Sequence, residues 1–183
     1  ATLRGGGLNI AECENCTITN VEVNNNHAGL MGSGIYVVSD GAQFTNITAD
    51  NNNAERGGGA FVNGTGVLIQ NSEFNNNHAD LLGGALDIAG NECHIINTHS
   101  NNNTAYRGGS TFIRGDNTLI EHCNLTNNTA TLRGGGLNIA GSGCQIINVD
   151  VSNNNAFDSD EEDSGLGGGI YVVADGTLFR NVT

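Results

Sequence analysis

The sequence predicts an all-β protein built as a parallel β-helix, and two observations lead to this fold class. The first is composition: the 183 residues include 28 Gly, 30 Asn and no Pro, which favours left-handed turns and disfavours helices. The second is a pattern of short apolar segments that recurs about every 26 residues. A chain with a fixed period of this length forms stacked repeats, so each unit is expected to be one coil of a solenoid.

Seven glycine-led segments are expected to form the first strand of each coil. Each ends in apolar residues at alternate positions, as in GGGLNI and GGGIYV, and a period of two is typical of a strand. Their third positions lie 27, 25, 26, 25, 26 and 33 residues apart. The segments are 5–10, 32–37, 57–62, 83–88, 108–113, 134–139 and 167–172. About seven coils are therefore predicted.

A second block recurs between these strands and ends in a run of Asn, as in residues 67–77 and 93–103. Its alternating apolar positions predict two further strands in each coil, and no stretch has the length and period of a helix. Three strands separated by turns make a three-sided coil. Equivalent apolar positions then stack into inward columns that form the core, one of which is Ile18, Phe44, Ile69, Ile95, Ile120, Ile146 and Phe179.

Asn residues at the same position of successive coils are predicted to form a structural ladder. An Asn amide can hydrogen-bond both its own turn and the identical Asn one coil away, which satisfies the peptide groups of a buried turn. The predicted ladder is Asn20, Asn46, Asn71, Asn97, Asn148 and Asn181, with His122 in place of Asn in one coil. The Asn triplets, such as 75–77, make a second column.

Two short motifs resemble those of a known family. The stretch FNNNHA at 74–79, followed by GGAL at 83–86, resembles the paired FxxN and GGA[ILV] repeats of the chlamydial-type polymorphic outer membrane proteins. Those repeats are surface passenger regions of autotransporters, and the resemblance implies a right-handed β-helix of the pectin-lyase-like type at the cell surface or outside the cell. The GGx half of the motif recurs in six of the seven units, with GSG at 32–34 in the other, whereas the Phe of FxxN stands only at Phe74.

Charge and length exclude some partners and indicate others. A net charge of -13 with no Lys excludes a nucleic-acid reader, and no apolar run is long enough to span a membrane. We interpret 1–183 as one uncapped β-helix segment of a longer array, because residues 1–11 recur letter for letter at 130–140. Further coils or subunits of the same protein are then expected to stack end to end on it, and glycans or other surface proteins are further candidate partners.

The predicted function is a non-catalytic structural or adhesive one, within a filament or a large surface protein. A carbohydrate-active enzyme or glycan-binding module is the alternative, but the outward column of the glycine-led strands holds one acid, Asp87, and no base. An ice-binding solenoid is a further alternative, which the mixed outward positions disfavour. The same outward column carries aromatic residues that are expected to be exposed: Tyr36, Phe61, Phe112 and Tyr171. They are interpreted as ordinary strand formers on a half-covered sheet, with contact to a partner or a glycan as the alternative.

Arginine and cysteine residues are given structural roles. Arg recurs just before the glycines and is expected to hydrogen-bond turn carbonyls or acidic neighbours; these residues are Arg4, Arg56, Arg107 and Arg133. Five Cys prevent complete internal pairing, and only Cys13 and Cys16 are close enough in sequence for a local disulfide. The other Cys residues are expected in the core.

Two features concern bound groups. An acidic insertion at 156–166 breaks the period; it is interpreted as a solvated loop, with calcium binding through Asp158, Asp160 and Asp163 as the alternative. No other cofactor is predicted. Asn-x-Thr sequons make Asn15, Asn63 and Asn124 candidate glycosylation sites in a secreted protein.

Overall fold

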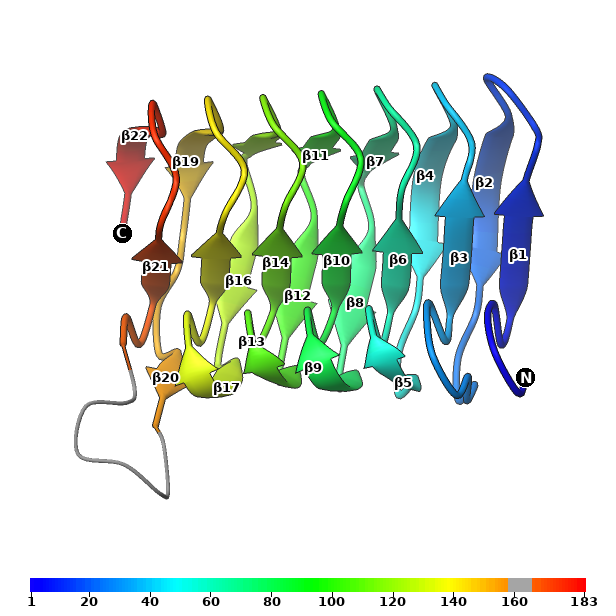
Figure 1. The fold of residues 1–183 in the computed structure, drawn as a ribbon, viewed down its shortest axis with the longest axis horizontal. Helices are drawn as coiled ribbons and strands as arrows, with labels where there is room; N and C mark the ends of the chain where they lie inside the picture. The colour runs from blue at the N-terminus through cyan, green and yellow to red at the C-terminus, as the bar shows by residue number, and fades with distance from the viewer. Residues whose placement is uncertain (158–165) are drawn as a thin grey trace.

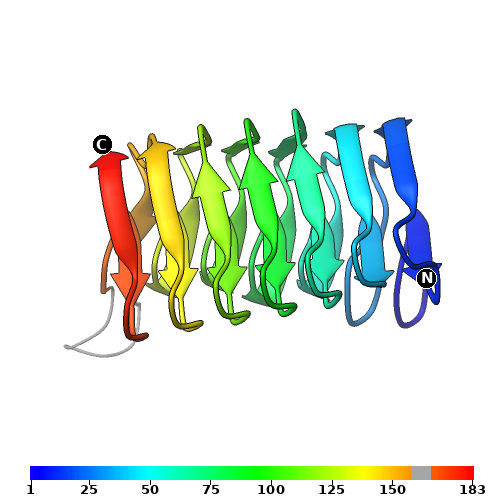
Figure 2. The ribbon, with the colours of Figure 1, turned by 90° about the horizontal axis from the view of Figure 1, so that it is seen from above.

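A computed structural model describes residues 1–157 and 166–183 of the chain. The regular secondary structure of this described part consists entirely of strands, which pair in parallel. Successive coils stack along one axis from β1 to β22 (Figure 1). Figure 2 shows the same row of coils from above, running from the N-terminal to the C-terminal end. The predicted all-β solenoid with coils of about 26 residues is confirmed. The middle coils contain four strands each, where three were predicted, because the chain pairs once more just before the glycines.

The glycine-led segments form a seven-stranded sheet. Its register places inward residues on inward residues, as in Leu86 beside Ala60 and Thr111. The outward residues also form one column, in which Asp87 lies between Phe61 and Phe112. The strands, in sheet order, are β1 (Leu8–Ala11), β3 (Ile35–Val38), β6 (Ala60–Val62), β10 (Leu86–Ile88), β14 (Thr111–Ile113), β18 (Leu137–Ile139) and β21 (Ile170–Val172).

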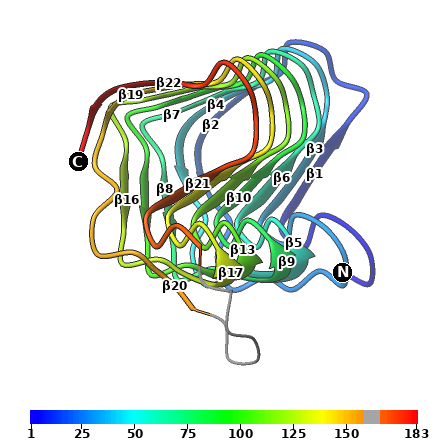
Figure 3. The ribbon, with the colours of Figure 1, turned by 60° about the vertical axis from the view of Figure 1, so that its left-hand side comes forward.

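A ten-stranded sheet forms two further sides of the coil, because it bends at a corner that Figure 3 shows between β7 and β8. One row of this sheet consists of β2 (Thr17–Glu22), β4 (Gln43–Thr48), β7 (Leu68–Gln70), β11 (His94–Ile96), β15 (Leu119–Glu121), β19 (Gln145–Val149) and β22 (Leu178–Val182). The other row consists of β8 (Glu73–Asn75), β12 (His99–Asn101) and β16 (Asn124–Thr126).

A five-stranded sheet closes the coil and leads into the glycines. The register shifts in the pairs formed by its first four strands, for example between Ala105 and Arg107, so these strands bend before the chain enters the seven-stranded sheet. The strands are β5 (Asn53–Arg56), β9 (His78–Leu82), β13 (Thr104–Arg107), β17 (Thr129–Arg133) and β20 (Asn155–Ala156).

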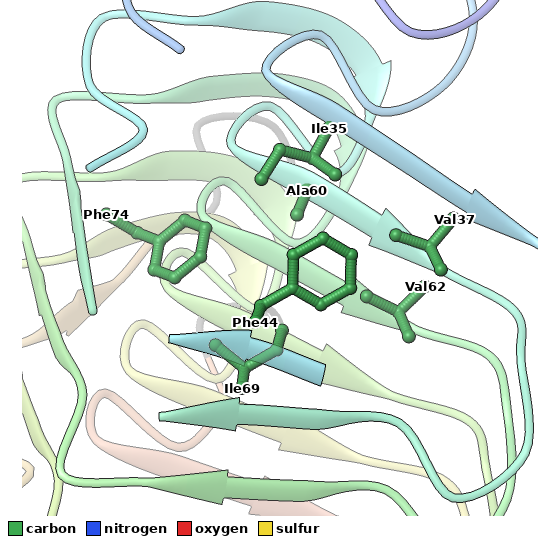
Figure 4. Close-up of a pocket in the computed structure, with 7 residues that line it drawn as sticks. All are labelled: Ile35, Val37, Phe44, Ala60, Val62, Ile69 and Phe74. Carbon is green, nitrogen blue, oxygen red and sulfur yellow. The ribbon is translucent and has the colours of Figure 1, made fainter. Parts of the chain in front are cut away.

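The core lies inside the coils and runs along the whole stack. In the second and third coils, Phe44 and Phe74 point inward between the sheets (Figure 4). They meet aliphatic side chains of β3, β6 and β7, and the group leaves no space for a water molecule. The inward columns predicted from the repeat are buried throughout the middle coils. Each coil adds apolar area that only its neighbours can cover, so the stack is stabilised from coil to coil.

The corners of the coils explain why Asn and Gly are so frequent. The first glycine of each pair, such as Gly83 with φ of 61°, has a left-handed backbone. The other left-handed residues are Gly and Asn apart from Glu12, Glu92 and His122. These two residue types adopt positive φ with the least strain. The second glycine serves a different purpose, since a Cβ at Gly84 would collide with the carbonyl oxygen of Gly109 in the next coil.

The predicted Asn column lies at the exposed bend of the ten-stranded sheet. These residues have φ between 49° and 57°, and the described hydrogen bonds join them only in pairs. The three pairs are Asn46 with Asn20, Asn97 with Asn71, and Asn181 with Asn148. This Asn column was expected in a buried turn, but it lies on an exposed corner. A convex corner leaves its side chains in solvent.

A continuous, buried ladder is formed instead by one Asn from each Asn run. It is the last Asn of 24–26, 75–77, 101–103 and 127–128, and the middle Asn of 51–53 and 153–155. From Asn52 onward, the side-chain oxygen of each residue accepts hydrogen bonds from both the backbone N–H and the amide of the corresponding Asn in the preceding coil, at 2.8–3.2 Å. The middle coils bury this ladder almost completely. Its members are Asn26, Asn52, Asn77, Asn103, Asn128 and Asn154.

Candidate functional site

Five of the six arginines of this acidic chain gather at the outer face of the seven-stranded sheet. Four of them precede the glycines in one column, whose register runs Arg4, Met31, Arg56, Leu82, Arg107, Arg133 and Leu166. The fifth, Arg114, follows β14. The parallel register therefore brings charges that are far apart in sequence onto one surface, which makes this face the candidate functional site.

The aromatic residues of this face are largely buried, so the expectation that they are exposed is wrong for three of the four. Tyr36, Phe61 and Phe112 are 7%, 5% and 6% exposed, and Tyr171 is half-buried. Tyr36 and Phe61 stack with ring centroids 5.5 Å apart.

Arginine side chains cover these rings. The guanidinium carbons of Arg4 and Arg56 lie 5.3 Å from the ring centroids of Tyr36 and Phe61, and that of Arg133 lies 5.0 Å from Tyr171. An arginine stem and guanidinium can shield an aromatic face while the charge keeps contact with water. The aromatic column is therefore a packed layer under the arginine side chains and not an open surface for a partner.

Asp87 is the single carboxylate of the outward column, and it is fully buried. Arg56 donates Nε to its Oδ2 at 2.9 Å. Arg114 donates Nε to Oδ1 at 3.1 Å and Nη2 to both carboxylate oxygens at 3.0 and 3.1 Å. Burial raises the pKa of Asp87, and the charges of Arg114 and Arg56 oppose this rise. Both oxygens are engaged, so Asp87 acts as the hub of an ion-pair cluster.

The arginines were expected to hydrogen-bond turn carbonyls or acidic neighbours, and the structure confirms this only in part. Arg56 contacts an acidic neighbour, as anticipated, but Arg4 and Arg133 lie over aromatic rings. Arg114 has no place in the glycine-led pattern, and sequence reasoning missed it. It reaches Asp87 from 27 residues away, and this spacing is close enough to one coil that stacking β10 on β14 would have suggested the contact.

A hollow of about 90 Å³ opens beside this cluster, toward the C-terminal end of the face. Arg107 and Arg133 flank it, and Phe112, Asn138 and Tyr171 contribute to its walls. Two positive charges and a half-buried ring line a small space, an arrangement suited to holding an anionic group.

A family model described as a right-handed β-helix region matches residues 2–156. The chain belongs to this family. The match confirms the right-handed parallel β-helix, while the finer resemblance to the chlamydial-type polymorphic outer membrane proteins stays a prediction. No curated protein and no solved structure matches the chain.

A second polar surface of this β-helix lies on the row β8, β12 and β16. Its hollow of about 270 Å³ is lined by Glu73, His99 and Asp150 together with amide and hydroxyl groups. Asn124 contacts His99 there, at 3.1 Å between Nδ2 and Nδ1. Across residues 1–157 and 166–183, no three His, Cys, Asp or Glu side chains are arranged to hold a metal ion.

The cysteines of the β-helix fall into two groups. The structure joins Cys13 and Cys16 as a disulfide, with their Cα atoms 5.7 Å apart. Cys93, Cys123 and Cys144 are free and buried. Burial raises the pKa of Cys93 and Cys123 to about 11, and it also raises the pKa of Cys144. These three thiols are inert packing residues at neutral pH.

The remaining candidate sites are placed as follows. Asn15, Asn63 and Asn124 of the sequons are exposed. The calcium candidates Asp158, Asp160 and Asp163 lie outside the described residues. Within the described part of the β-helix, no helix is long and apolar enough to cross a membrane.

Proposed function

We propose that this β-helix is a non-catalytic structural or adhesive segment of a large extracellular or cell-surface protein. The observation that carries the proposal is the state of Asp87. Glycoside hydrolysis uses two carboxyl groups, about 5–9.5 Å apart, that can reach the substrate. Asp87 is buried under two arginines, and its neighbours in the column are Phe61 and Phe112. The outward column therefore offers a packed ion pair and no free acid.

An extracellular or surface location is supported by the cysteines and the sequons. Disulfides persist in oxidising compartments, and the structure pairs Cys13 with Cys16. The sequon residues Asn15, Asn63 and Asn124 are exposed, as an acceptor of a glycan must be.

A structural role is supported by the way coils cover one another. Phe179 occupies a column whose members are buried in the middle coils, yet it is 41% exposed in the last coil. A further coil of the same pattern would cover it and pair with β22. We therefore propose that the natural contacts of this segment include stacked coils, within a longer array or between copies.

A glycan-binding module is the second candidate, because the hollow beside Arg107 and Arg133 has an aromatic wall. In this second proposal Asp87 is also non-catalytic. The difference from the first proposal is that the outer face of the seven-stranded sheet contacts a glycan.

Immunolabelling tests the proposed location and role. Antibodies against residues 1–183 are applied to intact source cells and followed by electron microscopy, with permeabilised cells as the control. The proposal predicts label on the surface of intact cells or on extracellular fibres. Label that appears only after permeabilisation would contradict it.

A further inference from the structure

Arg107 and Arg133 are neighbours on adjacent coils without an acidic partner among the described residues. Their Cα atoms are register partners in β13 and β17, and strands in a sheet lie about 4.8 Å apart. The described ion pairs of arginine both involve Asp87, through Arg56 and Arg114. The guanidinium carbon of Arg107 lies 5.6 Å from the centroid of the Tyr106 ring, and that of Arg133 lies 5.0 Å from the centroid of the Tyr171 ring. An anion between the two side chains would offset both charges.

Some hydrogen-bond donors of Arg107 and Arg133 also lack an acceptor. The Nε atoms of Arg107 and Arg133 are buried and have no hydrogen-bond partner, whereas the Nε atoms of Arg56 and Arg114 bind Asp87. A buried donor without an acceptor costs about 1–3 kcal/mol. Native structures rarely leave such groups unpaired, and an anion in the adjoining hollow would satisfy these donors if the two side chains turned toward it.

The hollow between these arginines has the size and lining of a small anion site. Its volume of about 90 Å³ is several times the roughly 10–15 Å³ that one water molecule needs by the same measure, which is enough for a carboxylate or a sulfate group. Asn138, 2% exposed, contributes an amide to the lining. Arg133 covers one face of the half-buried Tyr171 ring, and the part of the ring that lines the hollow can contact a molecule attached to the anionic group.

We propose that Arg107 and Arg133 form a binding site for an oxyanion, a carboxylate or sulfate group, carried on a ring that packs against Tyr171. The guanidinium groups hold the oxyanion by charge-assisted hydrogen bonds, which are bidentate for planar carboxylates. The proposed site binds its ligand and does not catalyse a reaction on it. It does not depend on the structural or adhesive role, because the same pair would bind an anion in any setting.

The repeat supplies an internal comparison. Arg4, Asn9 and Tyr36 correspond to Arg133, Asn138 and Tyr171, since residues 1–11 recur at 130–140. The column beside Arg4 continues with Met31, and no second arginine is adjacent there in the described chain. Arg4 therefore has the aromatic partner without the paired charge, and it serves as a matched control.

Calorimetric titration tests the site on residues 1–183 at constant low ionic strength. The probes are glucuronate and glucose 6-sulfate, which separate the two oxyanion types, with glucose as the neutral control and concentrations up to roughly 20 mM to capture millimolar affinity. The variants are Arg107→Leu and Arg4→Leu. Leucine is native to this column at Leu82, so both variants should fold, and their thermal unfolding verifies it.

We expect at least one of the two anionic probes to bind and the neutral sugar not to bind. Arg107→Leu should weaken the binding of that anion by more than tenfold. Arg4→Leu should change this affinity less than twofold. The proposal is overturned if neither anion binds, if glucose binds equally well, or if Arg4→Leu weakens binding as much as Arg107→Leu does, since that result indicates only diffuse attraction.

Discussion

The side-chain oxygen of Asn103 accepts two hydrogen bonds from Asn77, one from the backbone N–H at 2.8 Å and one from the amide at 3.1 Å. The Asn103 amide in turn donates to the Phe74 carbonyl at 2.8 Å and to Asn128 Oδ1 at 3.0 Å. One side chain therefore links consecutive coils and satisfies the peptide groups of a buried turn. The two hydrogen bonds to the side-chain oxygen repeat along the ladder from Asn26 to Asn154, which makes it a continuous side-chain contact between coils beside the backbone hydrogen bonds.

Asn103→Ala should lower the free energy of unfolding by about 3 kcal/mol, because it leaves the Asn77 N–H and the Phe74 carbonyl buried without partners. Urea denaturation measures the change. Asn97→His is the matched control, since His122 is native at the same exposed corner, and it should change stability by less than about 1 kcal/mol. Equal losses in the two variants would show that the buried ladder is not a special stabilising element.

Asp87→Asn should destabilise the β-helix at neutral pH by about 2 kcal/mol. It removes the countercharge of Arg56 and Arg114, whose side chains are partly exposed, so the loss is smaller than for a fully buried pair. The measurement is again the midpoint of urea unfolding. Arg180→Ala, at an exposed position of β22, is the control for loss of a charge and should have little effect. An Asp87→Asn variant as stable as the original chain would remove the ion-pair cluster from the account.

Asp50→Asn should stabilise the protein at pH 7 by less than about 1 kcal/mol, since the site is only partly buried. Burial and the nearby charges of Glu73 and Glu22 raise the pKa of Asp50 above its ordinary value of 3.8, against the hydrogen bond from Asn75. A raised carboxyl pKa means that the fold favours the protonated form. The stability contributed by this group is then fully present below pH 3.8 and is lost as the pH rises through the folded pKa.

The gain from Asp50→Asn should therefore shrink as the pH falls toward 3.8. Asparagine fits this position, because Asn24 Oδ1 makes the corresponding hydrogen bond to the next coil. Unfolding curves of both chains at pH 7 and pH 4 check the prediction. A gain that grows on acidification would contradict the direction of the pKa shift.

Three thiols should resist alkylation in the folded protein. Cys93 and Cys123 have pKa values of about 11, and Cys144 is also buried with a raised pKa. At pH 8 the thiolate fraction is small and access is blocked. Mass spectrometry after iodoacetamide treatment should find no adduct in native protein and three after unfolding without reductant. Five adducts in the unfolded, unreduced chain would contradict the Cys13–Cys16 disulfide.

Much of the fold could be predicted from the sequence because a solenoid repeats its environment. Each inward apolar position, such as Ile95 beside Ile69, has the same neighbours in every coil, so one period reveals the sheet and its register. The Asn triplets were harder to interpret. One residue of each triplet is left-handed and interrupts the strand alternation: the middle one in 75–77, Asn76 with φ of 56°, but the first one in 51–53, Asn51 with φ of 58°. The pattern alone therefore does not tell which Asn points inward.

The candidate site was less predictable, because long side chains reach beyond their own column. Alternation correctly places Phe61 on the outer side of β6, but it cannot show that Arg56 covers the ring. The partnership of Arg114 with Asp87 likewise depends on side-chain reach. An outward-pointing side chain on this face is therefore not always exposed to solvent. For that reason the exposure of the aromatic residues was predicted wrongly.

The most direct test of the non-catalytic interpretation is a turnover assay on purified residues 1–183. The protein is incubated with polyuronates and a panel of neutral and sulfated glycans, and the reducing ends and unsaturated uronate products are measured against heat-denatured protein. The account predicts no product above that control. Product that increases with protein concentration and disappears on denaturation would contradict it, most directly if Asp87→Asn abolished the activity in a variant that stays folded.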